Sequence, residues 1–247
     1  MKKDNIIHGG ALVNPQQKAL AQKMAIFSEV AYFNDPADKR RLLNKYGKSN
    51  WDIVPMTTND ATTFRNRNTG EVVVGVRGTD FKNVNDLLTD MAIIGGVSNF
   101  TPRQAVVNNI VQYAINKYGK DKVVLSGHSL GAKLSVNAAN KFNLKAYIYN
   151  SATSPLDFFS RSNKNIQDFS TNYAGNRDIV SWFGSLFKKY NQSEFNPSAK
   201  DAHSLQNFLP QTAEEIEQTG TGITSCCREC RDCNTHTKRH KYKKLLQ

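Results

Sequence analysis

Apolar residues in the first third of the chain follow a helical pattern and then an extended one. Between residues 16 and 33 they recur every three or four positions, and the same spacing predicts a second helix over 37–46. Strands are expected at 51–54, 62–66 and 71–76. Because an Asn-Thr-Gly turn separates the last two, they are predicted to form a β-hairpin.

The middle of the chain alternates between the two patterns. A helix is predicted over 101–118, followed by a strand over 122–126 and a helix over 130–142. Further strands are predicted over 145–150 and 166–174. This alternation, with nearly continuous apolar strands, predicts an α/β fold with a mostly parallel central sheet covered by helices on both faces.

Length and composition fit one enzyme-sized domain. With 247 residues, 39% of them hydrophobic, the chain can bury a substantial core. We expect a flexible leader over 1–14, an α/β domain over 15–224 and a disordered tail over 225–247. No stretch approaches the ~20 apolar residues of a membrane-spanning helix. The first ten residues also lack the apolar core of a secretory signal, which predicts an intracellular or packaged protein.

Positive charge is concentrated in the predicted tail. The whole chain carries a formal net charge of +12, and the tail holds seven Lys and Arg residues against two acidic ones. Such a tail is typical of proteins that bind an anionic partner, either nucleic acid or a lipid surface. A solvated, disordered tail without a partner explains the composition equally well.

The same tail contains all four cysteines of the chain. Cys227, Cys230, Cys233 and His236 recur every third residue and could hold a zinc ion. However, a structural zinc site usually joins two ligand pairs across a loop of about a dozen residues or more. Free or disulfide-paired tail cysteines are therefore favoured over a metal site.

The most informative motif is Gly-His-Ser-Leu-Gly at residues 127–131. It lies between a predicted buried strand and a predicted helix, where a sharp turn exposes the central Ser129 above the sheet as a nucleophile. Gly127 and Gly131 are needed because a Cβ atom at either position would collide with the crossing strand and helix.

A serine nucleophile needs a base, and His203 is the best candidate among five histidines. It lies downstream of Ser129, as the chain order nucleophile, acid, base requires on a hydrolase sheet. His128 is adjacent to the nucleophile but is expected to point away from it as a packed, hydrogen-bonded turn residue. The remaining histidines lie in the leader or the tail.

The acid that orients the base should lie between Ser129 and His203, at the end of a strand. Asp178 fits best, since it follows the predicted strand 166–174 and a Gly-Asn-Arg turn. Asp157 is the second candidate. Asp168 falls inside a strand, and Asp201 is too near His203 in sequence to reach its ring easily.

Two backbone amides are needed to stabilise the oxyanion that forms during attack. Leu130 supplies one, because it follows the nucleophile at the start of a helix. Thr79 is expected to supply the other, from the Arg-Gly-Thr segment after the strand 71–76.

Four sequence blocks together resemble the class 3 lipase family, the fungal-type triacylglycerol lipases of the α/β-hydrolase superfamily. The family's motifs match, in order, residues 74–79 (Val-Gly-Val-Arg-Gly-Thr), 127–132 (Gly-His-Ser-Leu-Gly-Ala), 175–180 (Gly-Asn-Arg-Asp-Ile-Val) and 202–205 (Ala-His-Ser-Leu). The resemblance implies an α/β-hydrolase fold, ester cleavage without a metal, and a triad of Ser129, Asp178 and His203 with an oxyanion donor at Thr79. The third block departs from the family's usual Gly-Asp-Pro-Val.

These observations predict a serine lipase or carboxylic-ester hydrolase that cleaves acylglycerol or phospholipid esters through an acyl-enzyme intermediate. Its substrate would be a lipid or a small acyl ester, presented in some cases at an anionic membrane surface. The alternative is a catalytically retired hydrolase scaffold that binds membrane or nucleic acid through its basic tail. The sequence does not determine the oligomeric state.

Overall fold

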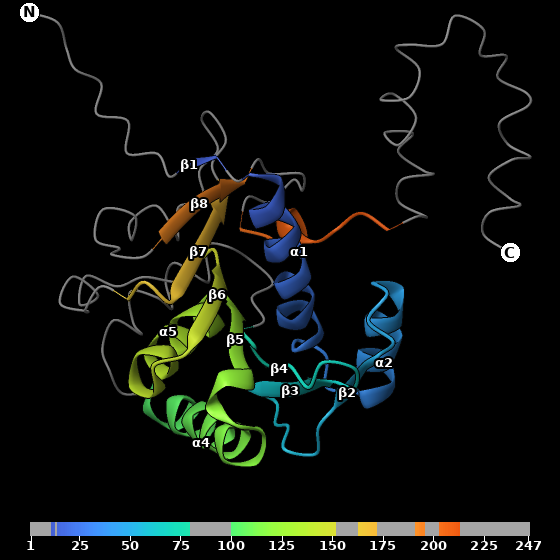
Figure 1. Cartoon of the computed structure of the whole chain (residues 1–247), viewed down its shortest axis with the longest axis vertical. Helices are drawn as coiled ribbons and strands as arrows, with labels where there is room; N and C mark the ends of the chain where they lie inside the picture. The colour runs from blue at the N-terminus through green and yellow to red at the C-terminus, as the bar shows by residue number, and fades with distance from the viewer. Residues whose placement is uncertain are drawn as a thin grey trace, which may run out of the picture. The chain divides into compact units, whose positions relative to one another are not determined.

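The computed structural model describes residues 11–12, 14–79, 100–151, 163–171, 191–195 and 203–212. Within these ranges, eight strands form one sheet in the order β1-β8-β7-β6-β5-β4-β3-β2 (Figure 1). The strands from β4 through β8 to β1 are parallel, whereas β2, β3 and β4 are antiparallel neighbours. Their bounds are Ala11–Leu12 (β1), Trp51–Ile53 (β2), Ala61–Asn66 (β3), Val72–Val76 (β4), Val123–His128 (β5), Lys145–Tyr149 (β6), Ile166–Thr171 (β7) and Asn191–Phe195 (β8).

Helices α1 and α2 begin where the sequence supplies capping residues. Asn14 and Gln17 form a reciprocal capping box at the start of α1, and the side chain of Asp35 accepts from the amide of Ala37 at the start of α2. Such caps satisfy backbone amides that have no partner within the helix. The helical elements are α1 (Pro15–Val30), α2 (Pro36–Lys45), α4 (Phe100–Tyr118), η1 (Lys120–Lys122), α5 (Leu130–Phe142) and η3 (Leu205–Phe208).

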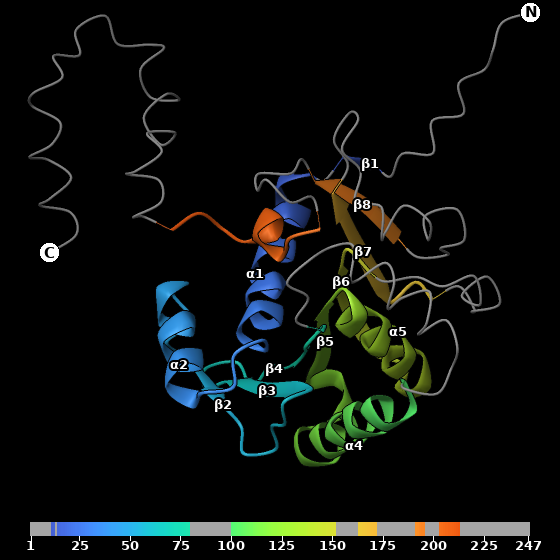
Figure 2. The same ribbon diagram turned by 180° about the vertical axis from the view of Figure 1, so that it is seen from behind.

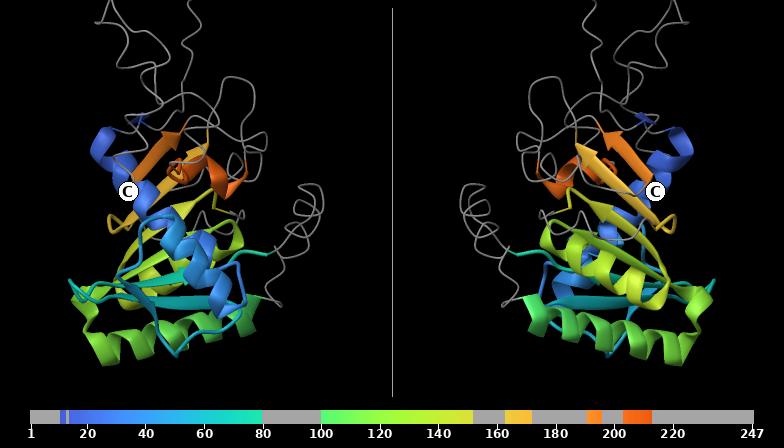
Figure 3. Two further views of the ribbon diagram at one scale, coloured as in Figure 1. Left: turned by 90° about the vertical axis from the view of Figure 1, so that its right-hand side faces the viewer. Right: turned by 90° about the vertical axis from the view of Figure 1, so that its left-hand side faces the viewer.

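The sheet is covered on both faces, and each strand contributes alternate residues to the two sides. Val72, Val74 and Val76 of β4 join one core cluster with α4 and α5. Val73 joins the other cluster, which α1 and η3 cover. Figures 1 and 2 show α1 on the opposite side of the central strands from α5, and Figure 3 shows α4 extended beneath them. This two-sided burial explains why the central strands read as continuous apolar runs.

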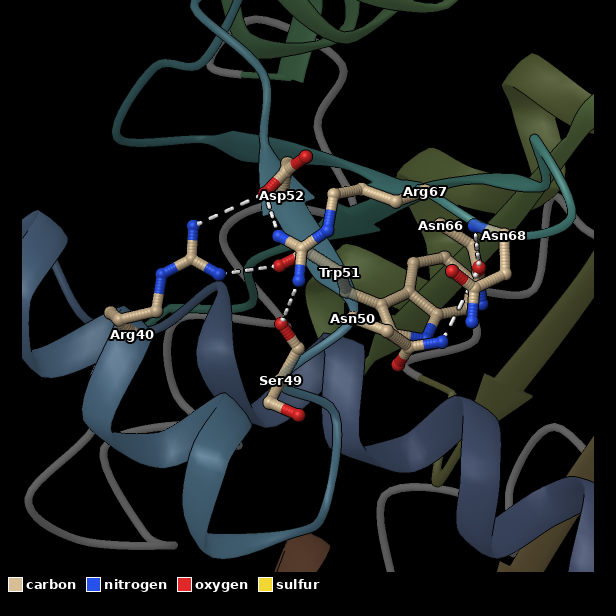
Figure 4. Close-up of polar contacts among 8 residues, drawn as sticks. All are labelled: Arg40, Ser49, Asn50, Trp51, Asp52, Asn66, Arg67 and Asn68. Carbon is tan, nitrogen blue, oxygen red and sulfur yellow. Dashed lines mark hydrogen bonds and ion pairs between the residues drawn. The ribbon is translucent and has the colours of Figure 1, made fainter.

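The edge strand β2 is held by arginines from two other elements (Figure 4). Arg40 of α2 donates to the backbone oxygen of Trp51 at 2.5 Å. Arg67, in the turn after β3, donates to Asp52 at 2.7 Å and to the backbone oxygen of Ser49 at 2.8 Å. These contacts fix the antiparallel end of the sheet beside α2.

The fold class predicted from the sequence is confirmed: a mostly parallel α/β sheet with helices on both faces. Ala11 and Leu12, expected in the leader, instead form β1 and pair in parallel with β8. The chain divides into two compact units, Met1–Pro210 and Gln211–Gln247. The predicted leader, domain and tail boundaries otherwise stay predictions, because most of residues 1–13 and all of 213–247 lie outside the described ranges.

Candidate active site

Ser129 occupies a strained turn between β5 and α5. Its backbone has φ 55° and ψ −123°, a combination that an L-residue adopts only when the surrounding structure enforces it. The amide of Ser129 donates to the backbone oxygen of Tyr149 at 3.0 Å, which fixes the turn against the end of β6. The serine is 2% exposed and its hydroxyl is buried, so the exposure above the sheet that the sequence predicted is not found. The chain thus holds this side chain in one orientation at an energetic cost, as a nucleophile elbow requires.

The two glycines of the motif are required by close backbone approach. A Cβ atom on Gly127 would lie 2.5 Å from the backbone oxygen of Gly131. A Cβ atom on Gly131 would collide with the backbone oxygen of Val76 and lie 2.7 Å from the carbonyl carbon of Arg77. The predicted collisions with the crossing helix and the neighbouring strand are therefore confirmed. This packing brings the segment after β4 directly against the elbow.

His203 lies beside the elbow because it is tied to His128. The ring of His128 is buried, its Nε2 lies 2.8 Å from the backbone oxygen of His203 and its Nδ1 lies 2.9 Å from the hydroxyl of Tyr32. A carbonyl oxygen only accepts, so Nε2 of His128 carries the proton; in the neutral ring Nδ1 then accepts from Tyr32. His128 is a packed, hydrogen-bonded turn residue, as expected from the sequence.

The rings of His128 and His203 stand 5.0 Å apart between centroids. His203 is 7% exposed, and its Nε2 is buried, as is Oγ of Ser129. Ser129 Oγ makes no hydrogen bond with any atom of the described residues, His203 included. The two groups therefore lie in one buried neighbourhood but are not joined by a hydrogen bond, a geometry that often tightens only when substrate binds.

The carboxylate of the site stays a prediction. Asp178, the preferred candidate, and Asp157, the second, lie outside the described residues, as does Asp201. Asp168 is 1% exposed and pairs with Ile148 inside β7, so its placement within a strand agrees with the sequence analysis.

The two candidate oxyanion donors come from adjacent parallel strands. Val76, the last residue of β4, pairs with Gly127 of β5, so Thr79 follows one strand and Leu130 follows its neighbour at the same sheet edge. Leu130 is the first residue of α5, where backbone amides lack partners within the helix. Gly78, directly before Thr79, is closely packed as well. A Cβ atom on it would collide with the hydroxyl of Tyr32 and lie 2.9 Å from the backbone oxygen of His128.

Two side chains at this edge of the sheet, Tyr32 and Arg103, were not identified as site residues from the sequence. Tyr32 is separated from His128 by 96 residues, and it looks like any aromatic residue near a helix end. Arg103 of α4 donates to the backbone oxygen of Arg77 at 2.9 Å and to Oγ1 of Thr79 at 3.5 Å. Neither residue belongs to a motif, so only the fold reveals that both support the segment after β4.

The part of the chain that the structure describes holds neither a metal-binding group nor a membrane-spanning helix. Among them, no group of three or more His, Cys, Asp or Glu side chains is arranged to hold a metal ion. None of the helices in these ranges combines the length and apolar character needed to cross a bilayer. The speculative zinc ligands Cys227, Cys230, Cys233 and His236 lie outside the described part of the chain.

Solved structures that resemble this fold include several lipases. One is a triacylglycerol lipase whose catalytic centre is described as a serine protease triad, with a TM-score of 0.52 and 16% identity over 83% of this chain and 94% of that one. Another is a fungal lipase, with a TM-score of 0.50 and 13% identity over 85% and 92% of the two chains. A lipase from Rhizopus microsporus var. chinensis has a TM-score of 0.49 and 20% identity over 69% and 70%.

No protein-family model matches the sequence, and no curated protein matches it. At these identities the structural likeness concerns the fold alone. The chain therefore has an α/β-hydrolase-like fold that it shares with triacylglycerol lipases, and its Gly-His-Ser-Leu-Gly turn lies between β5 and α5 at the edge where parallel strands end.

Proposed function

We propose that this chain is a serine lipase or carboxylic-ester hydrolase that cleaves acylglycerol or phospholipid esters. One observation carries the proposal. Ser129 is held at a positive φ on a turn that requires two glycines. His128, the residue directly before Ser129, is hydrogen-bonded to the backbone oxygen of His203. A strained backbone of this kind persists at sites where the orientation of one side chain matters for function.

In the proposed reaction, Oγ of Ser129 attacks the ester carbonyl while His203 takes its proton. The tetrahedral intermediate collapses as His203 returns that proton to the leaving alcohol, which leaves an acyl group on Ser129. Water then attacks the acyl carbonyl while His203 takes its proton. The bond between the acyl group and Oγ breaks as His203 returns the proton to Ser129, and the fatty acid leaves. Asp178 is the proposed partner that orients the ring of His203 and stabilises it when it becomes charged.

The negative charge on the ester oxygen would be held by the backbone amides of Thr79 and Leu130. Both residues follow strands that end at the same sheet edge as Ser129. Donors fixed in advance stabilise developing charge without reorganisation, and removing one typically costs about 10²–10³ in kcat. None of these steps requires a metal or another cofactor.

Covalent labelling tests this proposal directly. A fluorophosphonate probe should modify the folded protein, and peptide mass spectrometry should locate the adduct on Ser129. Ser129→Ala should abolish labelling and lower kcat on a chromogenic acyl ester by about 10⁶. Ser28→Ala is a matched control, because Ser28 is also fully buried but is bonded to Ser126 at 2.7 Å on the α1 face of the sheet.

The outcomes separate the two candidate functions. Labelling at Ser129 that survives Ser28→Ala supports the hydrolase. A folded protein that stays unlabelled and inactive on acylglycerol and phospholipid panels supports the retired scaffold. In that case, salt-sensitive binding of DNA or anionic vesicles that disappears on removing residues 225–247 would identify the tail as the functional part.

A further inference from the structure

Arg103 connects three separate segments at the edge of the sheet where Ser129 lies. From the first turns of α4, its Nε donates to Asp60 at 2.6 Å, just before β3. Its Nη2 donates to the backbone oxygen of Arg77 at 2.9 Å, and its Nη1 donates to Oγ1 of Thr79 at 3.5 Å. All three nitrogens of one guanidinium are thus directed at different groups.

Asp60 supports the same segment independently of its side chain. Its backbone oxygen accepts from the amide of Arg77 at 2.9 Å, so Arg77 has its amide bonded to Asp60 and its carbonyl bonded to Arg103. Gly78 is confined in turn by Tyr32 and by the backbone of His128. Every residue from Arg77 to Thr79 is therefore held by a contact outside the segment.

The ion pair between Arg103 and Asp60 is partly shielded, with side chains that are 25% and 28% exposed. Arginine suits this position because its planar group presents donors in a fixed fork. A lysine ammonium is a single point with rotatable donors, and it would be unable to span the carboxylate, the Arg77 carbonyl and Thr79 at once. The geometry is specific to arginine, not merely to a positive charge.

We propose that Arg103, fixed by Asp60, is a positioning residue that holds the segment Arg77–Thr79 in the conformation needed to stabilise the oxyanion. This role rests on the proposed hydrolase function. Arg103 acts through the backbone of Arg77 and the side chain of Thr79. Its contribution is pre-organisation: the donor is already in place when charge develops, so no rearrangement is required during attack.

The contacts of Arg103 with Asp60, Arg77 and Thr79 form a clamp on the segment Arg77–Thr79. Amide hydrogen exchange tests this clamp without relying on activity. In Arg103→Gln and Arg103→Lys, exchange at the amide of Arg77, which donates to the backbone oxygen of Asp60, should accelerate at least about tenfold, while the central strands β4 and β5 keep their protection. Arg65→Gln is the matched control, since Arg65 is exposed and packs over the ring of Tyr118, 5.7 Å from its centroid. It should leave exchange at the amide of Arg77 unchanged.

Kinetics test what the clamp does. Arg103→Lys and Arg103→Gln should lower kcat by about 10- to 100-fold with little change in KM, because the lost interaction matters only in the transition state. Affinity for a trifluoromethyl ketone, which forms an oxyanion on Ser129, should fall by the same factor. Combining Arg103→Gln with Thr79→Ala should cost less than the product of the two single effects.

Three outcomes decide the matter. Faster exchange together with the kcat loss supports the clamp and its role. Unchanged exchange and kcat within about twofold of wild type overturn it, although the hydrolase function would stand. If the variants exchange faster but the wild-type protein shows no Ser129-dependent turnover, the oxyanion role is overturned together with the proposed function. If Arg103→Gln does not fold, Arg103→Lys and Asp60→Asn provide the same comparison.

Discussion

His128 donates a hydrogen bond from Nε2 to the backbone oxygen of His203 over 2.8 Å. The residue before the proposed nucleophile therefore holds the backbone of the proposed base. Tyr32 bonds to the other ring nitrogen of His128 and also lies against Gly78. One aromatic pair thus links the end of α1, the elbow, the segment after β4 and the loop that carries His203.

Tyr32→Phe tests this link. Losing the hydroxyl removes the bond to Nδ1 of His128, which should lower the free energy of unfolding by about 1 kcal/mol and kcat by about 3- to 10-fold. Urea unfolding and ester hydrolysis measure the two effects. Tyr113→Phe is the control, since the hydroxyl of Tyr113 is bonded only at the surface by Lys117 among the contacts described. Equal losses of unfolding free energy and of kcat in the two variants would contradict the link.

Backbone strain at Ser129 predicts an unusual order of stabilities. Ser129→Gly and Ser129→Ala should both be inactive, but glycine tolerates φ 55° whereas alanine does not. Ser129→Gly should therefore be more stable than Ser129→Ala by about 1–2 kcal/mol in thermal or urea unfolding. Equal stabilities would show that the elbow is not strained.

Gly131→Ala should be among the most damaging single substitutions in the chain. The added Cβ would meet the backbone of Val76 and Arg77, neither of which can move without displacing β4. A loss of at least about 3 kcal/mol, or failure to fold, is expected. Circular dichroism with thermal unfolding measures it. A native-like melting temperature would exclude the close approach of β4 and α5 described above.

Burial of Glu29 makes stability depend on pH. Burial raises the pKa of this carboxyl above its ordinary value, and the hydrogen bond from Gln206 only partly offsets the effect. Because the folded-state pKa is higher, the folded state binds the proton more tightly. The contribution of Glu29 to stability is then fully present below about pH 4.5, the pKa of the carboxyl in the unfolded chain, and is lost as pH rises through the folded-state pKa.

Glu29→Gln should therefore stabilise the protein at pH 7 and make little difference near pH 4, since glutamine keeps an oxygen that can accept from Gln206. Urea unfolding of both proteins at the two pH values gives the comparison. A variant that is less stable than wild type at pH 7 would contradict the direction assigned to Glu29.

The central part of the fold was predictable because its chemistry is local. β4 and β5 are buried on both faces and so read as continuous apolar runs. Gly127 and Gly131, on either side of Ser129, mark a turn where the backbone packs too closely for a side chain. In contrast, β8 reads Asn-Gln-Ser-Glu-Phe and pairs at the far side of the sheet with the two-residue β1. A short polar segment of this kind carries no hydrophobic pattern to reveal it.

The supporting contacts of the site could not be predicted for a different reason. Ser129 and His203 belong to motifs, and each was identified from its own sequence neighbours. Tyr32 and Arg103 act through side-chain hydrogen bonds to residues distant in the chain. A hydrogen bond between distant residues imposes no periodicity on the sequence, so such partners become visible only when the sheet brings them together.

The most direct test of the central claim is a crystal structure of the protein after reaction with a phosphonate ester. The account predicts a covalent bond from phosphorus to Oγ of Ser129, with the phosphonyl oxygen about 3 Å from the amides of Leu130 and Thr79. Nε2 of His203 should lie about 3 Å from Oγ. An adduct on another residue, or a His203 ring that remains beyond hydrogen-bond reach of Ser129 in the adduct, would contradict it.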